Sequence, residues 1–76
     1  MMGDGQLITT ATPDRLSKLD VAILAELASG GSQSKVARHL GMSSRTIRRR
    51  LRQICNRLDV EAPIEAVAWA ARHRII

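Results

Sequence analysis

Residues Gly41 to Leu58 read GMSSRTIRRRLRQICNRL, a stretch with six arginines and no acidic residue. Isoleucine and leucine recur through it at positions 47, 51, 54 and 58. At about 100° per residue these four side chains fall on one narrow stripe of an α-helix, and the Ser43 hydroxyl is placed to cap its first free amides. The pattern predicts a helix over residues 44–58 that is buried along one edge.

Cations crowd the other sides of this predicted helix. The side chains that point directly away from the apolar stripe are Arg45, Arg49, Arg52 and Asn56, with Arg48 and Gln53 on the shoulders of that outer face. The flanks carry Thr46, Arg50 and Arg57 on one side and Cys55 on the other. Like charges three and four positions apart repel by roughly a few tenths of a kcal/mol each, so the isolated helix is frustrated. A row of phosphates would convert that repulsion into attraction.

The net charge of +5 is unevenly distributed along the chain. The segment 27–58 holds eight basic residues and no acid, whereas the rest of the chain holds four basic and seven acidic residues. Such segregation produces a one-sided field, which is typical of proteins that bind polyanions. The alternative is an ordinary solvated charged face, although no acid balances the charge in this segment.

Apolar spacing and turn residues predict three further helices and no strand. They cover residues 18–29, 33–40 and 63–73. The expected inward-facing side chains of the first two are Leu19, Ile23, Leu24, Leu27, Ala28, Val36, Ala37 and Leu40. We therefore expect an all-α, four-helix domain over residues 14–76, preceded by a flexible tail over residues 1–13. The Thr12-Pro13-Asp14 segment is itself a cap signature and predicts an extra turn before Ser17.

The connection between the second and third helices has the spacing of a helix-turn-helix. That motif needs a small residue inside its first helix, a residue tolerant of positive φ in the turn, and an apolar anchor early in its second helix. Ala37, Gly41 and Ile47 meet these needs in turn.

Composition excludes several classes of function. Trp69 is the only aromatic residue, so the chain has no platform on which to stack unpaired bases. No apolar run approaches the roughly 20 residues that span a bilayer, and the lone thiol of Cys55 fits a reducing, cytoplasmic setting. His39 and His73 have no partners at ligand spacing, and no phosphate-binding loop or nucleophile–base pair is evident. We expect neither an enzyme nor a bound metal or cofactor.

From Leu16 to about Arg72 the sequence resembles the LuxR-type (GerE-type) helix-turn-helix domain of bacterial transcription regulators. The resemblance rests on LSKLDVAILAELASGGSQSKVARHLGMSSRTIRRRLRQICNRLDV, residues 16–60, set against a family pattern of Leu-Thr, Glu, Val-Leu, Ala-x-Gly-x-Ser, Ile-Ala-x-x-Leu, Ser-x-x-Thr-Val-Lys-x-His and Lys-Leu. The chain departs from it with Arg50 where His is usual, Gln33-Ser34-Lys35 where Asn-Lys-Glu is common, and Pro63 where Arg often stands.

The resemblance implies which side chains meet DNA. The positions that reach base edges in the major groove correspond to Arg48, Arg49 and Arg52, and we expect arginine to pair with guanine O6 and N7 there. The positions on the DNA backbone correspond to Ser32, Gln33, Ser34, Thr46 and Arg57, and the start of the third helix adds Ser44 and Arg45. On this basis Arg57→Ala should weaken binding to all sequences alike.

The last helix of that family often forms the dimer contact, and EAVAWAA at residues 65–71 resembles it. The interface candidates are Ile64, Val67, Ala68, Ala71 and Trp69. Trp69 has a second interpretation, in which it completes the core of this domain.

These observations favour sequence-specific binding of double-stranded DNA by the effector domain of a bacterial transcription regulator. The expected partners are operator DNA and a second copy of the chain, with RNA polymerase or an N-terminal sensory domain as further candidates and no membrane. The alternative is a protein-interaction module whose basic face docks an acidic partner. Cys55 also has two interpretations, an oxidant-sensing thiol beside a cationic face or a half-buried spacer.

Overall fold

The computed structural model describes residues 16–76, and these form four helices with no strand among them. In chain order they are α2 (Lys18–Ala28), α3 (Gln33–Leu40), α4 (Ser44–Leu58) and α5 (Pro63–Arg72). The predicted all-α fold is confirmed, with the ends of α2 and α5 one residue earlier than expected. The predicted tail over residues 1–13 and the extra turn at residues 12–14 lie outside the described residues.

Serine side chains begin the first three helices. The Oγ atoms of Ser17, Ser32 and Ser43 accept hydrogen bonds from the amides of Asp20, Lys35 and Thr46 at 3.1, 3.2 and 3.1 Å. At α5, where Ala62 has no side-chain acceptor, Glu65 Oε1 accepts from the amides of Glu61 and Ala62 at 2.8 and 3.3 Å. Each helix start therefore satisfies amides that would otherwise have no partner.

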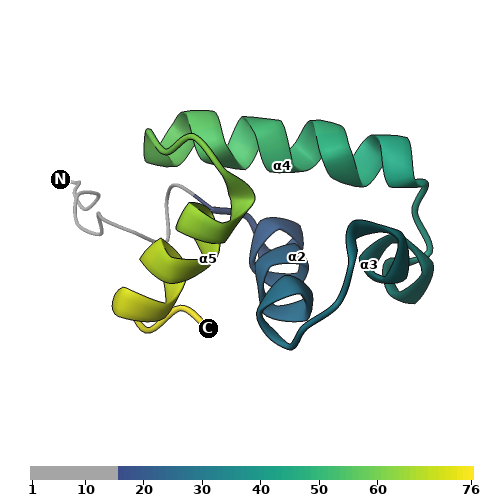
Figure 1. Cartoon of the computed structure of the whole chain (residues 1–76), viewed down its shortest axis with the longest axis horizontal. Helices are drawn as coiled ribbons and strands as arrows, with labels where there is room; N and C mark the ends of the chain where they lie inside the picture. Colours follow the sequence, from purple (N-terminus) through teal and green to yellow (C-terminus); the bar gives the residue numbers. More distant parts are fainter. Residues whose placement is uncertain (1–15) are drawn as a thin grey trace, which may run out of the picture.

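The turn between α3 and α4 depends on Gly41. Its φ of 68° lies in the left-handed region, which glycine adopts without steric cost. The amide of Met42 then donates to the carbonyl of Ala37 at 2.8 Å, which closes the end of α3. The predicted helix-turn-helix geometry is present in the structure, with α4 leaving the turn at a steep angle to α3 (Figure 1).

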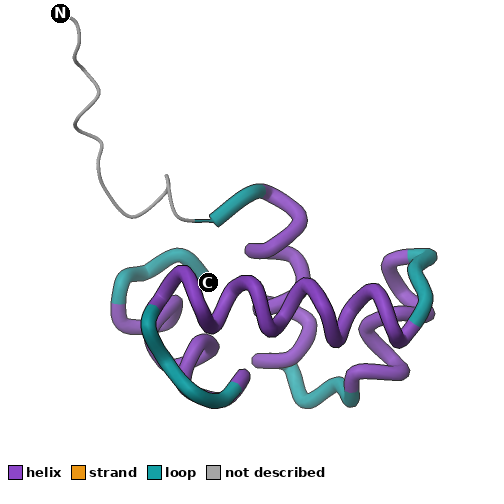
Figure 2. Tube along the Cα trace, turned by 90° about the horizontal axis from the view of Figure 1, so that it is seen from above, coloured by secondary structure: helices purple, strands orange, loops and turns teal. Residues whose placement is uncertain are grey.

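The core lies beneath α4, which crosses over α5, α2 and α3 (Figure 1). Seen from above, α4 runs across the molecule with no other described segment covering its outer side (Figure 2). The predicted stripe of Ile47, Leu51, Ile54 and Leu58 is buried throughout. Aliphatic side chains from the other helices complete the core, chiefly Ile23, Leu24, Val36, Ala37, Ala66 and Ala70. No helix among the described residues is long and apolar enough to cross a membrane.

Two expectations about the core need correction. Ala28 is exposed at the end of α2, and Leu19, Leu27 and Leu40 are only half-buried where they pack against the core. Asp20, which was not expected in the core, is completely buried. Asp20 lies on the same face as Ile23, Leu24 and Leu27, at the i, i+3, i+4 and i+7 positions of one helical stripe.

Candidate nucleic-acid interface

The outer side of α4 carries an uncompensated basic surface, which we call the arginine face and define as Arg45, Arg48, Arg49 and Arg52. All four side chains are exposed, and none forms an ion pair with another residue in the described range 16–76. They border one shallow hollow of about 310 Å³. The three predicted base-reading residues thus lie together on one surface, opposite the buried stripe of the same helix.

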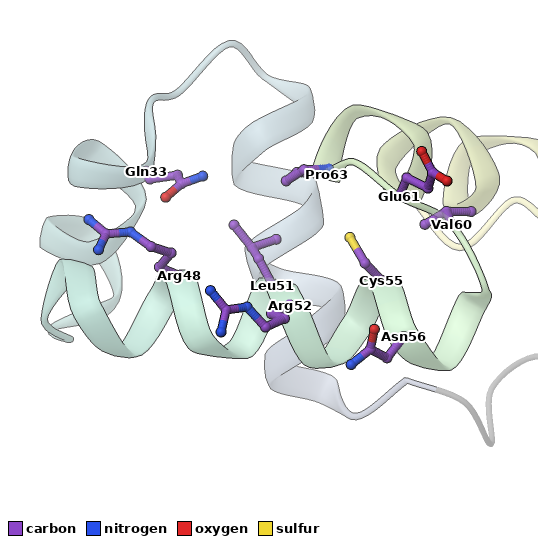
Figure 3. A pocket seen from close by; sticks show the side chains of 9 residues that line it. All are labelled: Gln33, Arg48, Leu51, Arg52, Cys55, Asn56, Val60, Glu61 and Pro63. Atoms are coloured by element: carbon purple, nitrogen blue, oxygen red, sulfur yellow. The ribbon is translucent and has the colours of Figure 1, made fainter.

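A second hollow, of about 410 Å³, lies beside the arginine face and extends from α3 to the start of α5. Figure 3 shows Gln33 on α3 and Arg48 on α4 at one end, and Val60 and Glu61 toward the other. Leu51, Cys55 and Pro63 line its middle. The start of α3 and the arginine face therefore border one continuous depression in the surface.

The start of α3 holds three of the predicted backbone-contact residues. Ser32 and Ser34 are exposed and Gln33 is partly exposed. The Ser32 Oγ atom already accepts from the Lys35 amide, which leaves its hydroxyl proton available for a further acceptor. Free amides and hydroxyls at a helix start suit an anion, because the macrodipole is positive there.

The start of α4 holds three more predicted backbone-contact residues. Arg45 is exposed, whereas Ser44 and Thr46 are partly exposed. The Thr46 Oγ1 atom accepts a hydrogen bond from Ser43 Oγ at 2.9 Å, so the capping serine orients the threonine side chain. The two helix starts and the arginine face form the surface on which the sequence predicts DNA contact.

Arg57 and Arg50 are held in a different environment. Arg57 Nη1 donates to Asp20 Oδ2 at 3.2 Å, and Arg50 Nε lies 3.8 Å from Asp20 Oδ1. The Asp20 side chain is 0% exposed, whereas those of Arg50 and Arg57 are 32% and 50% exposed. Arg57 was expected at the DNA backbone; the structure shows its half-exposed side chain donating to the buried carboxylate of Asp20.

Sequence reasoning did not predict that Asp20 pairs with α4. Asp20 does complete the capping box, because its Oδ2 atom also accepts from the Ser17 amide at 3.0 Å. The signal that could have revealed the second role is its position in the apolar stripe of α2, since a buried carboxylate needs a cationic or hydrogen-bonded partner.

Helix α5 presents the predicted dimer candidates on different sides. Ala66 and Ala70, which the sequence did not single out, face the core and are fully buried. Ile64 is 72% exposed, Ala68 and Ala71 are exposed, and Val67 is half-buried. The first three therefore form an apolar strip on the surface, with Val67 at its edge.

Trp69 is partly buried against the core. Its ring stacks on that of His73, with centroids 4.1 Å apart and planes inclined by 25°. These contacts agree with the interpretation that Trp69 completes the core, and they place it away from the exposed strip.

Cys55 is buried, with 6% of its surface exposed. Burial, and secondly the negative charge of Glu65, raise the pKa of its thiol. A raised pKa keeps the thiol protonated and unreactive near neutral pH. Burial and the raised pKa support the interpretation of Cys55 as a spacer, and the residue is more deeply buried than the half-buried position expected.

Comparison with protein families matches the helix-turn-helix segment. Residues 27–53 match the family described as bacterial regulatory protein, Fis family. The matched segment includes the last residues of α2, all of α3, and α4 as far as Gln53. Neither a search of curated proteins nor a search of solved structures found a match. The match and the fold agree on a helix-turn-helix domain of the kind that binds DNA sequence-specifically in bacterial transcription regulators.

Proposed function

We propose that α4 is the recognition helix of a LuxR-type regulator domain and enters the major groove of operator DNA. The observation that carries this proposal is the arginine face: four exposed guanidinium groups on one helix, with no carboxylate partner in residues 16–76. The LuxR-type assignment is supported by α5, a helix that follows the recognition helix and whose exposed strip is suited to a dimer contact.

Within this proposal, Arg49 and Arg52 donate to guanine O6 and N7, and Arg48 is shared between a base and the backbone. Phosphates are held by side chains and amides at the starts of α3 and α4, namely Ser32, Gln33, Ser34, Ser44, Arg45 and Thr46. Arg57 is left out of this set because its guanidinium donates to Asp20. The domain binds and does not catalyse, it acts in the cytoplasm, and it requires no cofactor.

A second copy of the chain binds beside the first. A single small domain buries little DNA surface, so two copies on a pseudo-palindromic site supply the affinity that an operator needs. The exposed strip of Ile64, Ala68 and Ala71, with Val67 at its edge, is the dimer contact we propose. Trp69, which packs against the core and stacks on His73, is left out of this contact.

The test is selection of bound duplexes from a random pool, followed by titration of the best sequence and of random duplex over a range of salt. We expect guanine-containing half-sites, and binding whose log K falls with log salt at about −0.9 per phosphate contacted. No affinity for any duplex at moderate salt would overturn the proposal and favour docking to an acidic protein.

A further inference from the structure

We infer that Asp20 is a positioning residue that withholds Arg50 and Arg57 from DNA and thereby sets which face of α4 is presented to the duplex. This inference rests on the proposed function. It concerns a buried acid on α2 that makes no contact with the DNA.

Asp20 links α2 to two arginines of α4. Asp20 lies under α4, and its two carboxylate oxygens face two arginines that are seven residues apart, on the same side of that helix. Oδ2 accepts from both Ser17 N and Arg57 Nη1, at 3.0 and 3.2 Å. Oδ1 is buried without a hydrogen bond, and Arg50 Nε lies 3.8 Å from it. The carboxylate is therefore anchored at α2 by its own helix cap and binds α4 from below.

The Asp20 carboxylate lowers the number of α4 arginines that are free to neutralise phosphates. Without Asp20, all six arginines of α4 would be available to phosphates. The carboxylate pairs with the two on the flank and leaves the four of the arginine face unpaired in the described structure. Counterion release responds to the number of phosphates neutralised, so the pairing lowers the sequence-independent part of the binding.

The pairing also affects which side of α4 faces the duplex. Phosphate contacts position a recognition helix, and base contacts specify the sequence. If the flank arginines were free, α4 would gain phosphate contacts with that side turned toward the duplex, away from the orientation in which Arg49 and Arg52 face the bases. We call the pairing of Asp20 with Arg50 and Arg57 the Asp20 clamp. By holding these two arginines against α2, the clamp favours a single docking orientation and so contributes to specificity.

The experiment compares charge-matched variants by fluorescence anisotropy on random-sequence duplex across a salt series. Asp20→Asn removes the carboxylate charge and keeps an oxygen for the Ser17 amide. Its control is Asp59→Asn, which makes the same change in net charge at an exposed residue with no arginine partner in residues 16–76. The positive φ of Asp59 is one that asparagine also tolerates. We expect the slope of log K against log salt to become more negative by about 0.9 to 1.8 in Asp20→Asn, and by less than half of that in Asp59→Asn.

A second pair of variants does not depend on the folding of Asp20→Asn. Arg57→Gln removes a charge and retains a donor for Asp20, and Arg45→Gln removes a charge from the arginine face. We expect Arg45→Gln to make the slope less negative by about 0.9, and Arg57→Gln to leave it nearly unchanged. The ratio of affinities for selected and random duplex should fall in Asp20→Asn and stay constant in Arg57→Gln.

The outcomes separate the two proposals. The clamp would be overturned if Arg57→Gln and Arg45→Gln made the slope of log K against log salt less negative by the same amount. It would also be overturned if Asp20→Asn were folded by circular dichroism and had the wild-type slope. Both results leave DNA binding itself intact. A wild-type chain with no salt-dependent affinity for duplex would overturn the proposed function and, with it, the clamp.

Discussion

Arg57 on α4 donates to Asp20 on α2 across 3.2 Å, and 37 residues separate them in the chain. The pair is asymmetric, because the carboxylate is fully buried and half of the arginine side chain is exposed. Removing Asp20 therefore leaves an arginine charge in contact with water, whereas removing Arg57 leaves a carboxylate charge in the core.

This asymmetry predicts unequal losses of stability. Arg57→Ala leaves a buried carboxylate with only the Ser17 amide and Arg50, whose Nε lies 3.8 Å from Oδ1. We expect this variant to lower the free energy of unfolding by about 2 to 3 kcal/mol. Asp20→Asn leaves two arginines that water can solvate, and we expect a loss of about 1 kcal/mol. Urea unfolding followed by circular dichroism measures both. Arg52→Ala is the control and should change the free energy of unfolding by less than about 0.5 kcal/mol. A loss in Arg57→Ala no larger than that in Arg52→Ala would show that the pair is unimportant for stability.

Base recognition predicts a sequence-dependent loss in Arg49→Ala. We expect this variant to lose about 1 to 3 kcal/mol on the selected operator and to relax the preference at one base pair, because a bidentate contact with guanine is removed. The control is Arg45→Ala, which removes the same charge from an exposed residue proposed to hold the DNA backbone. It should weaken selected and random duplexes alike. A gel-shift titration in which the two variants lose the same affinity on every sequence would refute base reading by Arg49.

The helix-turn-helix and the buried stripe of α4 were predictable from the sequence because their signals are local. Serine caps, Gly41, and apolar residues at helical spacing each act within one or two turns of the chain. The Asp20–Arg57 pair was not predictable in this way, since it depends on how α2 and α4 cross. The pair leads us to propose a loss of stability in Arg57→Ala in place of the expected loss of binding to all sequences. The inward face of α5 was missed for a related reason: with alanine on most sides of the helix, apolar spacing does not distinguish Ala66 and Ala70 from Ala68 and Ala71.

Burial of Cys55 predicts a thiol that is unreactive in the native protein. Its pKa is raised by desolvation and then by Glu65, so the thiolate fraction near pH 7 is below that of a free cysteine. We expect alkylation by iodoacetamide to be slower than in the unfolded chain by about tenfold or more. The reference is the double variant Cys55→Ala, Ser34→Cys, which carries one thiol at an exposed position. Equal alkylation rates for Cys55 and for this exposed thiol would contradict the burial and the raised pKa together.

The exposed strip on α5 predicts a dimer that one charge disrupts. Ile64 is 72% exposed although it is a large apolar residue, and the exposed Ala68 and Ala71 lie on the same side of the helix. We expect Ile64→Glu to raise the dimer dissociation constant by at least about tenfold, which corresponds to about 1.4 kcal/mol. The fold should be preserved, because an acid in the first turn of a helix interacts favourably with the macrodipole. Ala28→Glu adds the same charge at an exposed apolar position on α2 and should leave association unchanged. Sedimentation equilibrium distinguishes the outcomes, and a dimer that persists in Ile64→Glu would exclude this strip as the contact between copies.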